Sequence, residues 1–242
     1  MKDKLLVLLV CASLTATAQV GGIKSASSSK GGREGGGSTS IGATYMLIDL
    51  AIRVLPEWQM TVLQQRGDVP NVLSLEVFGQ VATQPSTYYV FTPRVRGNWG
   101  IFLTDFRVNY MVEEMIGAPQ DLRTDDWQVI GLNLVNTRNV TARLSTGFMH
   151  EAFGARKFFH ESVFGLSVMN DSQSFGGMTE FRLAKDYNVY TIPRFEGSVG
   201  VQKKLLDRGS MHLFLTGGVM FQRYYNEINV WGMQGGMAFK LY

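Results

Sequence analysis

The chain has 242 residues, of which 45% are hydrophobic and 18% are charged, and its formal net charge at pH 7 is +3. A balance this close to neutral gives no basis for binding nucleic acid or another polyanion. The single cysteine, Cys11, lies in the apolar stretch near the start, so the rest of the sequence offers neither a disulfide nor a thiolate metal site.

Residues 1–18 have the features of a secretory signal peptide. A basic start precedes an apolar stretch from Leu5 to Ala12 and a small-residue cleavage site, Ala16-Thr17-Ala18. We therefore expect an exported protein whose mature chain begins at Gln19. Loss of the leader would lower the formal net charge from +3 to +2.

Residues 19–40 are rich in glycine and serine, and from Gly21 to Ser40 the only apolar side chains are Ile23 and Ala26. So little apolar surface cannot offset the entropy of ordering the chain, which predicts a flexible linker. The glycines could also be interpreted as a phosphate-binding loop. However, no apolar strand precedes them and the Gly-Lys-Ser/Thr ending of such a loop is absent.

Residues 41–70 are predicted to contain a short amphipathic helix. Apolar and charged residues recur there at helical spacing on two faces, namely Leu47, Ala51 and Val54 against Asp49, Arg53 and Glu57. Pro56 is expected to end or kink this helix. The helix could lie in a membrane interface, plug the mouth of a barrel, or pack on other protein.

After the leader, no run approaches the roughly 18 apolar residues that a membrane-spanning helix requires. The best candidate, Tyr45 to Leu55, is interrupted by Asp49 and Arg53. If the chain crosses a membrane, it must therefore do so as a closed sheet.

Residues 71–242 alternate apolar and polar side chains, as Leu73, Leu75 and Val77 do against Ser74 and Glu76. The pattern predicts an all-β fold, an antiparallel transmembrane β-barrel of about 8–10 strands. A turn is expected at Gly97-Asn98. The expected strand segments are 72–81, 87–96, 99–110, 127–136, 139–149, 157–169, 176–185, 192–203, 210–222 and 228–242.

A soluble β-sandwich is the main alternative fold, because its strands also alternate. Segments of nine or more residues are longer than the strands common in soluble sheets and match a tilted crossing of a bilayer. Aromatic residues near segment ends would form interfacial girdles. These are Tyr88, Tyr89, Trp99, Tyr110, Trp127, Tyr224, Tyr225, Trp231 and Tyr242.

The cleavage site, the ladder of alternating strands and the terminal Phe239-Lys240-Leu241-Tyr242 together resemble the small outer-membrane β-barrel proteins of Gram-negative bacteria. The resemblance implies an aromatic C-terminal residue that is read by the barrel-assembly machinery, and an outer wall in contact with outer-membrane lipid. It names no activity, because members of this family include pores, adhesins, enzymes and structural barrels.

Charged residues of both signs are predicted on the inward faces of the strands. In a barrel of 8–10 strands the lumen is narrow enough for side chains to fill it, so we expect a salt-bridged plug. A basic constriction that selects anions, built on Arg94, Arg96 and Arg107, is the alternative. The predicted network comprises Glu76, Arg94, Arg96, Asp105, Arg107, Arg143, Glu161, Glu180, Arg182, Arg194 and Glu196.

His160 and Ser162 share one strand face, and a His-x-Ser pair resembles the catalytic strand of outer-membrane lipid A deacylases. The orienting acid is missing, since Glu161 and Glu180 are predicted to point into the lumen. No motif for a metal, a dinucleotide or another cofactor is present.

The sequence thus favours a non-enzymatic outer-membrane barrel with a narrow, charge-filled lumen. It would act as a structural or accessory subunit, with a protein partner in a membrane complex. A small pore for ions or solutes is the alternative, and a lipid A-modifying hydrolase that uses His160 and Ser162 is the second alternative.

Overall fold

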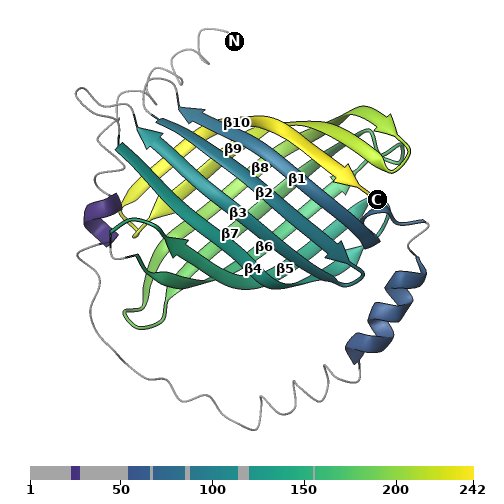
Figure 1. Ribbon diagram of the computed structural model, residues 1–242, viewed down its shortest axis with the longest axis horizontal. Coiled ribbons are helices and arrows are strands. Elements are labelled where there is room, and N and C mark those ends of the chain that lie inside the picture. Colours follow the sequence, from purple (N-terminus) through teal and green to yellow (C-terminus); the bar gives the residue numbers. More distant parts are fainter. Residues whose placement is uncertain (1–22, 28–53, 66–67, 85–87, 114–119, 155) are drawn as a thin grey trace, which may run out of the picture.

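The computed structural model describes residues 23–27, 54–65, 68–84, 88–113, 120–154 and 156–242. Within them, ten antiparallel strands close into a barrel (Figure 1), which confirms the predicted fold class. A 3-10 turn, Pro70–Val72, leads into the first strand. The strands are β1 (Leu73–Gln84), β2 (Tyr88–Trp99), β3 (Phe102–Glu113), β4 (Gln120–Asn136), β5 (Val140–Glu151), β6 (Phe158–Met169), β7 (Phe175–Asp186), β8 (Thr191–Arg208), β9 (Met211–Tyr224) and β10 (Ile228–Leu241).

Each strand pairs with its neighbours in sequence, and β1 closes the ring by pairing with β10, so that the sheet has no free edge. Because the number of strands is even, β1 begins and β10 ends at the same end of the barrel. We call this end the C-terminal mouth. The opposite end, where β1 leads into β2, is the far mouth.

Several strand boundaries differ from the sequence prediction by three residues or more, as at β8, which runs to Arg208 rather than to residue 203. The turn predicted at Gly97-Asn98 is wrong, because β2 continues to Trp99 and the turn contains Gly100, whose φ is +61°. The Asn98 side chain points inward and donates a hydrogen bond to Ser74 Oγ at 2.9 Å. β4 begins at Gln120 rather than near 127, so its polar first half belongs to the barrel wall.

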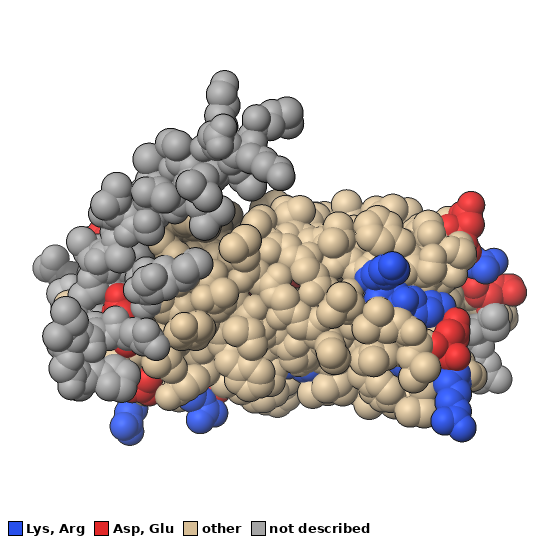
Figure 2. Space-filling model, turned by 90° about the horizontal axis from the view of Figure 1, so that it is seen from above, with Lys and Arg blue, Asp and Glu red and all other residues tan. Residues whose placement is uncertain are grey.

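Residues alternate between the lumen and the outer wall along every strand, as the pleat of a β-strand requires. The outer side chains are mainly large and apolar, and examples such as Val77, Val95, Leu144 and Val199 are 40 to 56% exposed. On the face shown in Figure 2, charged side chains gather toward the two ends and leave a largely uncharged belt between them. The molecule therefore presents an apolar outside and, as described below, a polar inside.

A helix over residues 54–64 lies at the C-terminal mouth (Figure 1). Gln59 fixes it to the β2–β3 turn, since its side-chain amide donates to the Trp99 carbonyl oxygen at 3.2 Å and its Oε1 accepts from the Ile101 amide at 2.7 Å. The described helix runs from Val54 through Pro56 to residue 64, so Pro56 does not end it, and a kink, the other predicted outcome, stays a prediction. The rest of the predicted helix, residues 43–53, lies outside the described residues.

Residues 23–27 form one helical turn at the far mouth (Figure 1). Ile23 is fully buried and Ala26 is 6% exposed, so the prediction of a flexible linker does not hold for these five residues. The two apolar side chains of the Gly/Ser-rich segment are the ones that pack against the barrel. The remainder of residues 19–40 is outside the described part of the chain.

None of the helices in the described ranges is long and apolar enough to cross a membrane.

Candidate functional site

The lumen holds a continuous layer of charged side chains, which the strand register places there. Arg96 of β2 lies opposite Glu76 of β1 on one side and Asp105 of β3 on the other. Side chains two residues apart on one strand point to the same face, so Arg94 and Arg107 enter the same layer.

The first part of the layer is centred on two arginines of β2. Arg94 Nη2 donates to Glu180 Oε2 at 2.7 Å and forms a close ion pair with Asp105. Arg96 contacts Glu76 at 3.3 Å, Asp105 at 3.1 Å and Glu180 at 3.2 Å. Of these two arginines, Asp105 and Glu180 contact both, whereas Glu76 contacts only Arg96.

The second part lies nearer the far mouth. Arg107 Nη2 contacts Asp126 Oδ2 at 2.7 Å, and its Nη1 contacts Glu196 Oε1 at 2.5 Å. Arg194 contacts Asp126 at 2.7 Å and Glu161 at 2.6 Å, and both partners are fully buried.

Arg182 joins the two parts into one network. It lies 2.8 Å from Glu180 and 3.2 Å from Glu161, and within 4.0 Å of Asp105 and Asp126. Its side chain is 1% exposed. Buried charges of this kind are tolerated only when they are paired and hydrogen-bonded, since their desolvation is costly. The layer is therefore a mutually neutralising set that fills the cross-section of the lumen.

Neutral side chains complete the layer. Gln222 donates to Glu196 Oε2 at 2.8 Å, Tyr224 donates to Gln222 at 3.2 Å, and Gln128 donates to Glu161. Sequence reasoning missed these residues and also Asp126, which it assigned to a loop. Asp126 is fully buried and lies within 4.0 Å of three arginines, Arg107, Arg182 and Arg194.

The eleven residues predicted to share the lumen all lie on its inner face, but they do not all join the network. Ten make the contacts given above. Arg143 instead lines a cavity of about 50 Å³ on the C-terminal side of the layer, together with Glu76. Lys240 lines the same cavity and was not among the predicted residues.

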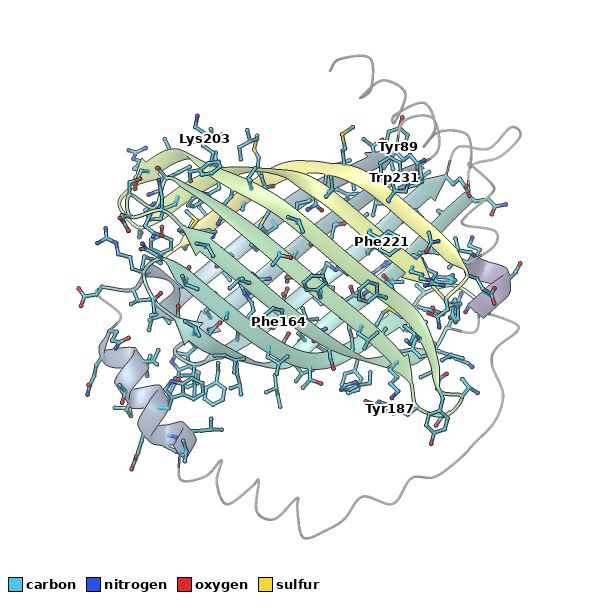
Figure 3. The ribbon with its side chains drawn as sticks, turned by 180° about the vertical axis from the view of Figure 1, so that it is seen from behind. Tyr89, Phe164, Tyr187, Lys203, Phe221 and Trp231 are labelled. Atoms are coloured by element: carbon cyan, nitrogen blue, oxygen red, sulfur yellow. The ribbon has the colours of Figure 1, made fainter. Side chains whose placement is uncertain are left out.

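Apolar side chains close the lumen beyond the charged layer, toward the far mouth. The cluster consists of Ile23, Ala26, Ala82, Tyr88, Val90, Met111, Leu122, Phe153, Met220, Tyr224, Tyr225 and Val230. The prediction that Tyr88, Tyr224 and Tyr225 belong to an outer aromatic girdle is therefore wrong, since they are 0 to 3% exposed. Tyr89 and Trp231, by contrast, do point outward near this end (Figure 3).

Glu151 links the turn at 23–27 to the barrel. Its carboxylate accepts hydrogen bonds from Ser27 Oγ at 2.7 Å and from the Tyr225 hydroxyl at 2.7 Å. Burial and the adjacent Glu151 raise the pKa of Tyr225, so the phenol keeps its proton and remains a donor. The far mouth is thus closed by both apolar packing and hydrogen bonds.

His160 and Ser162 lie on the outer face of β6, where the His160 ring contacts side chains other than Ser162. His160 Nε2 is 2.6 Å from Thr146 Oγ1, and its Nδ1 is 3.4 Å from the Tyr187 hydroxyl. Among the described residues, no carboxylate lies within 4.0 Å of this ring, and no group of three or more His, Cys, Asp or Glu side chains is placed to hold a metal ion. Glu161 and Glu180 point into the lumen.

Fold and site together define a closed ten-stranded antiparallel β-barrel with an apolar outer wall and an ion-paired lumen. Comparison with known proteins adds no relative, since no family model and no curated protein matches this sequence.

Proposed function

We propose that this protein is an outer-membrane β-barrel with a closed, charge-filled lumen, acting as a structural or accessory subunit of a membrane complex. The observation that carries the proposal is the ion-pair network that joins opposite walls of the lumen. A wide aqueous path requires that such side chains stay near the wall, and here they meet in the middle.

The outer wall supports a membrane location. Apolar side chains face outward along all ten strands, while outward charges such as Lys203, Arg208 and Arg223 lie near strand ends. Figure 3 places Phe164 in the middle of the wall, and Lys203 and Tyr187 toward opposite ends. An apolar belt with charged margins is the arrangement that a bilayer stabilises.

Short connections support an accessory role over an adhesive one. At the far mouth only residues 187–190 join β7 to β8, and only 225–227 join β9 to β10. At the C-terminal mouth, Gly209 and Ser210 alone join β8 to β9. Short loops and a filled lumen offer little surface for binding. A partner protein would therefore bind the outer wall or one of the two mouths.

The test is fractionation followed by purification of the tagged full chain from outer membranes in a mild detergent. We expect the chain in the outer-membrane fraction, with faster gel migration before boiling than after it, because closed barrels resist detergent unfolding. A second protein should co-purify in a fixed ratio. Recovery of a soluble periplasmic protein would refute the location, and a lone chain after cross-linking in cells would refute the accessory role.

A further inference from the structure

A small cavity interrupts the packing of the lumen between the charged layer and the C-terminal mouth. Its volume is about 50 Å³, and its wall includes Glu76, Arg143, Ser167, Gln202 and Lys240 from five different strands. About 10 to 15 Å³ is enough to hold one water molecule. The cavity therefore has room for a small ion with a few waters.

The charges around this cavity do not balance. Four cationic side chains line it, namely Arg94, Arg96, Arg143 and Lys240, against two carboxylates, Glu76 and Glu180. Asp105 compensates one more positive charge, through Arg94 and Arg96. One buried positive charge is left over, and an uncompensated charge in such a place is costly.

Lys240 is the first of the two cations without an ion-pair partner. Lys240 is 8% exposed and lies opposite Glu76 in the β1–β10 register. The Glu76 carboxylate contacts Arg96 instead, at 3.3 Å, and no carboxylate among the described residues lies within 4.0 Å of the lysine ammonium group. That group lies over the Phe214 ring, 4.9 Å from its centroid.

Arg143 is the second. It extends from β5, on the wall opposite β10, which carries Lys240, in the ten-stranded ring. Its Nε is buried and has no hydrogen-bond partner in the described structure. Gly165 makes room for it, because a Cβ at this position would lie 3.0 Å from Arg143 Cγ. Two cations from opposite walls thus line one cavity, each with unused hydrogen-bond donors.

We propose that this cavity binds one small monovalent anion of chloride size, held by Lys240 and Arg143. Such an ion would neutralise the excess positive charge. It would also accept hydrogen bonds from the N–H groups of both side chains that have no other acceptor. A cation is disfavoured by the four basic groups. A multivalent anion is disfavoured by the nearby carboxylates Glu76 and Glu180, which are already paired with Arg96 and Arg94.

Bromide is the probe that tests the site directly. Crystals of the full chain grown in sodium bromide should show one anomalous peak within hydrogen-bond distance of Lys240 Nζ and Arg143 Nε. The variants Arg143→Met and Lys240→Met should each lose this peak. The control Lys203→Met, which removes an exposed lysine of the outer wall, should keep it.

A measurement in detergent solution checks the same ion without crystals. At equal ionic strength, the unfolding temperature of the wild type should be higher in chloride than in gluconate, and this difference should vanish in Arg143→Met and Lys240→Met. If Arg143→Met does not fold, as judged by heat-dependent gel mobility, Gly165→Ala displaces the same side chain and should lose the chloride dependence. An empty or water-filled cavity in bromide, or a peak that persists in folded variants, would overturn the proposal.

Discussion

Arg107 on β3 and Glu196 on β8 meet across the full width of the lumen, with 2.5 Å between Nη1 and Oε1. Their strands lie on opposite sides of the ten-stranded ring. Arg94 on β2 and Glu180 on β7 repeat the relationship at 2.7 Å. These pairs act as struts, so the same side chains that balance charge also hold opposite walls together.

Removal of both members of a strut should cost less than the two single removals added together. Arg107→Met leaves the buried Glu196 carboxylate without its arginine, and we expect the free energy of unfolding to fall by about 3 to 5 kcal/mol. The double variant Arg107→Met/Glu196→Gln should cost less than the sum of the two single variants. Urea unfolding in lipid vesicles measures this, with Arg208→Met at an exposed position as control. Additive losses would contradict a direct pair.

We expect the ion-pair network to prevent ion conduction through the barrel. In planar bilayers we expect no stable channels from the wild type, because the Arg94 and Arg107 struts and the apolar far mouth obstruct the lumen in series. Truncation of both struts, in Arg94→Ala/Arg107→Ala, should raise the frequency of brief openings. Large, anion-selective wild-type channels that lose selectivity on either single substitution would favour a pore instead.

Chemical labelling can test closure of the far mouth by residues 23–27. Ile23 is fully buried, whereas Ser25 two residues later is exposed. We expect Ser25→Cys to react with a water-soluble maleimide at least tenfold faster than Ile23→Cys, because only the former side chain is accessible. Adding Glu151→Gln weakens the hydrogen bonds to Ser27 and Tyr225, and should speed labelling at position 23. Equal rates at both positions would refute the closure.

The period-two pattern was sufficient to predict the barrel and the inward face of β1 to β3. Glu76, Arg96 and Asp105 could be assigned to one layer because alternation fixes which side chains point inward. Once the sheet closes into a barrel, the inward side chains are buried in the lumen. Their burial can therefore be predicted without knowing the strand register.

Alternation failed where the register shifts or where burial depends on distant contacts. Asp126 follows another acidic residue in a polar stretch, and β4 has an irregularity between Trp127 and Ile130, so the local pattern indicated a loop. Ile23 is surrounded by glycine and serine, and its burial depends on partners such as Val230, some two hundred residues away. Such contacts leave no local periodicity to detect.

The hydrolase alternative predicts a lipid product that we do not expect. His160 is engaged by Thr146 and Tyr187 rather than by Ser162. We therefore expect Ser162→Ala to leave the acylation of lipid A unchanged in cells that express the protein. Mass spectrometry of extracted lipid A measures the acylation. A lipid A species that is present with the wild type and vanishes with this substitution would establish the enzyme.

The most discriminating test of the membrane proposal places one charge in the apolar belt. Phe164 is outward on β6, 40% exposed, and lies between Leu144 on β5 and Phe181 on β7 (Figure 3). In a bilayer, Phe164→Arg puts a guanidinium near the midplane, and we expect a loss of about 2 to 4 kcal/mol in the free energy of unfolding.

The matched control is Tyr187→Arg, because Tyr187 is 54% exposed and lies in the connection at the far mouth. There an arginine reaches the interface, and the cost should be about 0 to 1 kcal/mol. A soluble barrel predicts otherwise, since an exposed surface substitution usually changes stability by less than about 0.5 kcal/mol at either position. Unfolding in vesicles of both variants therefore separates the two cases. A small, equal effect at positions 164 and 187 would mean that the apolar belt faces water or a protein partner rather than lipid.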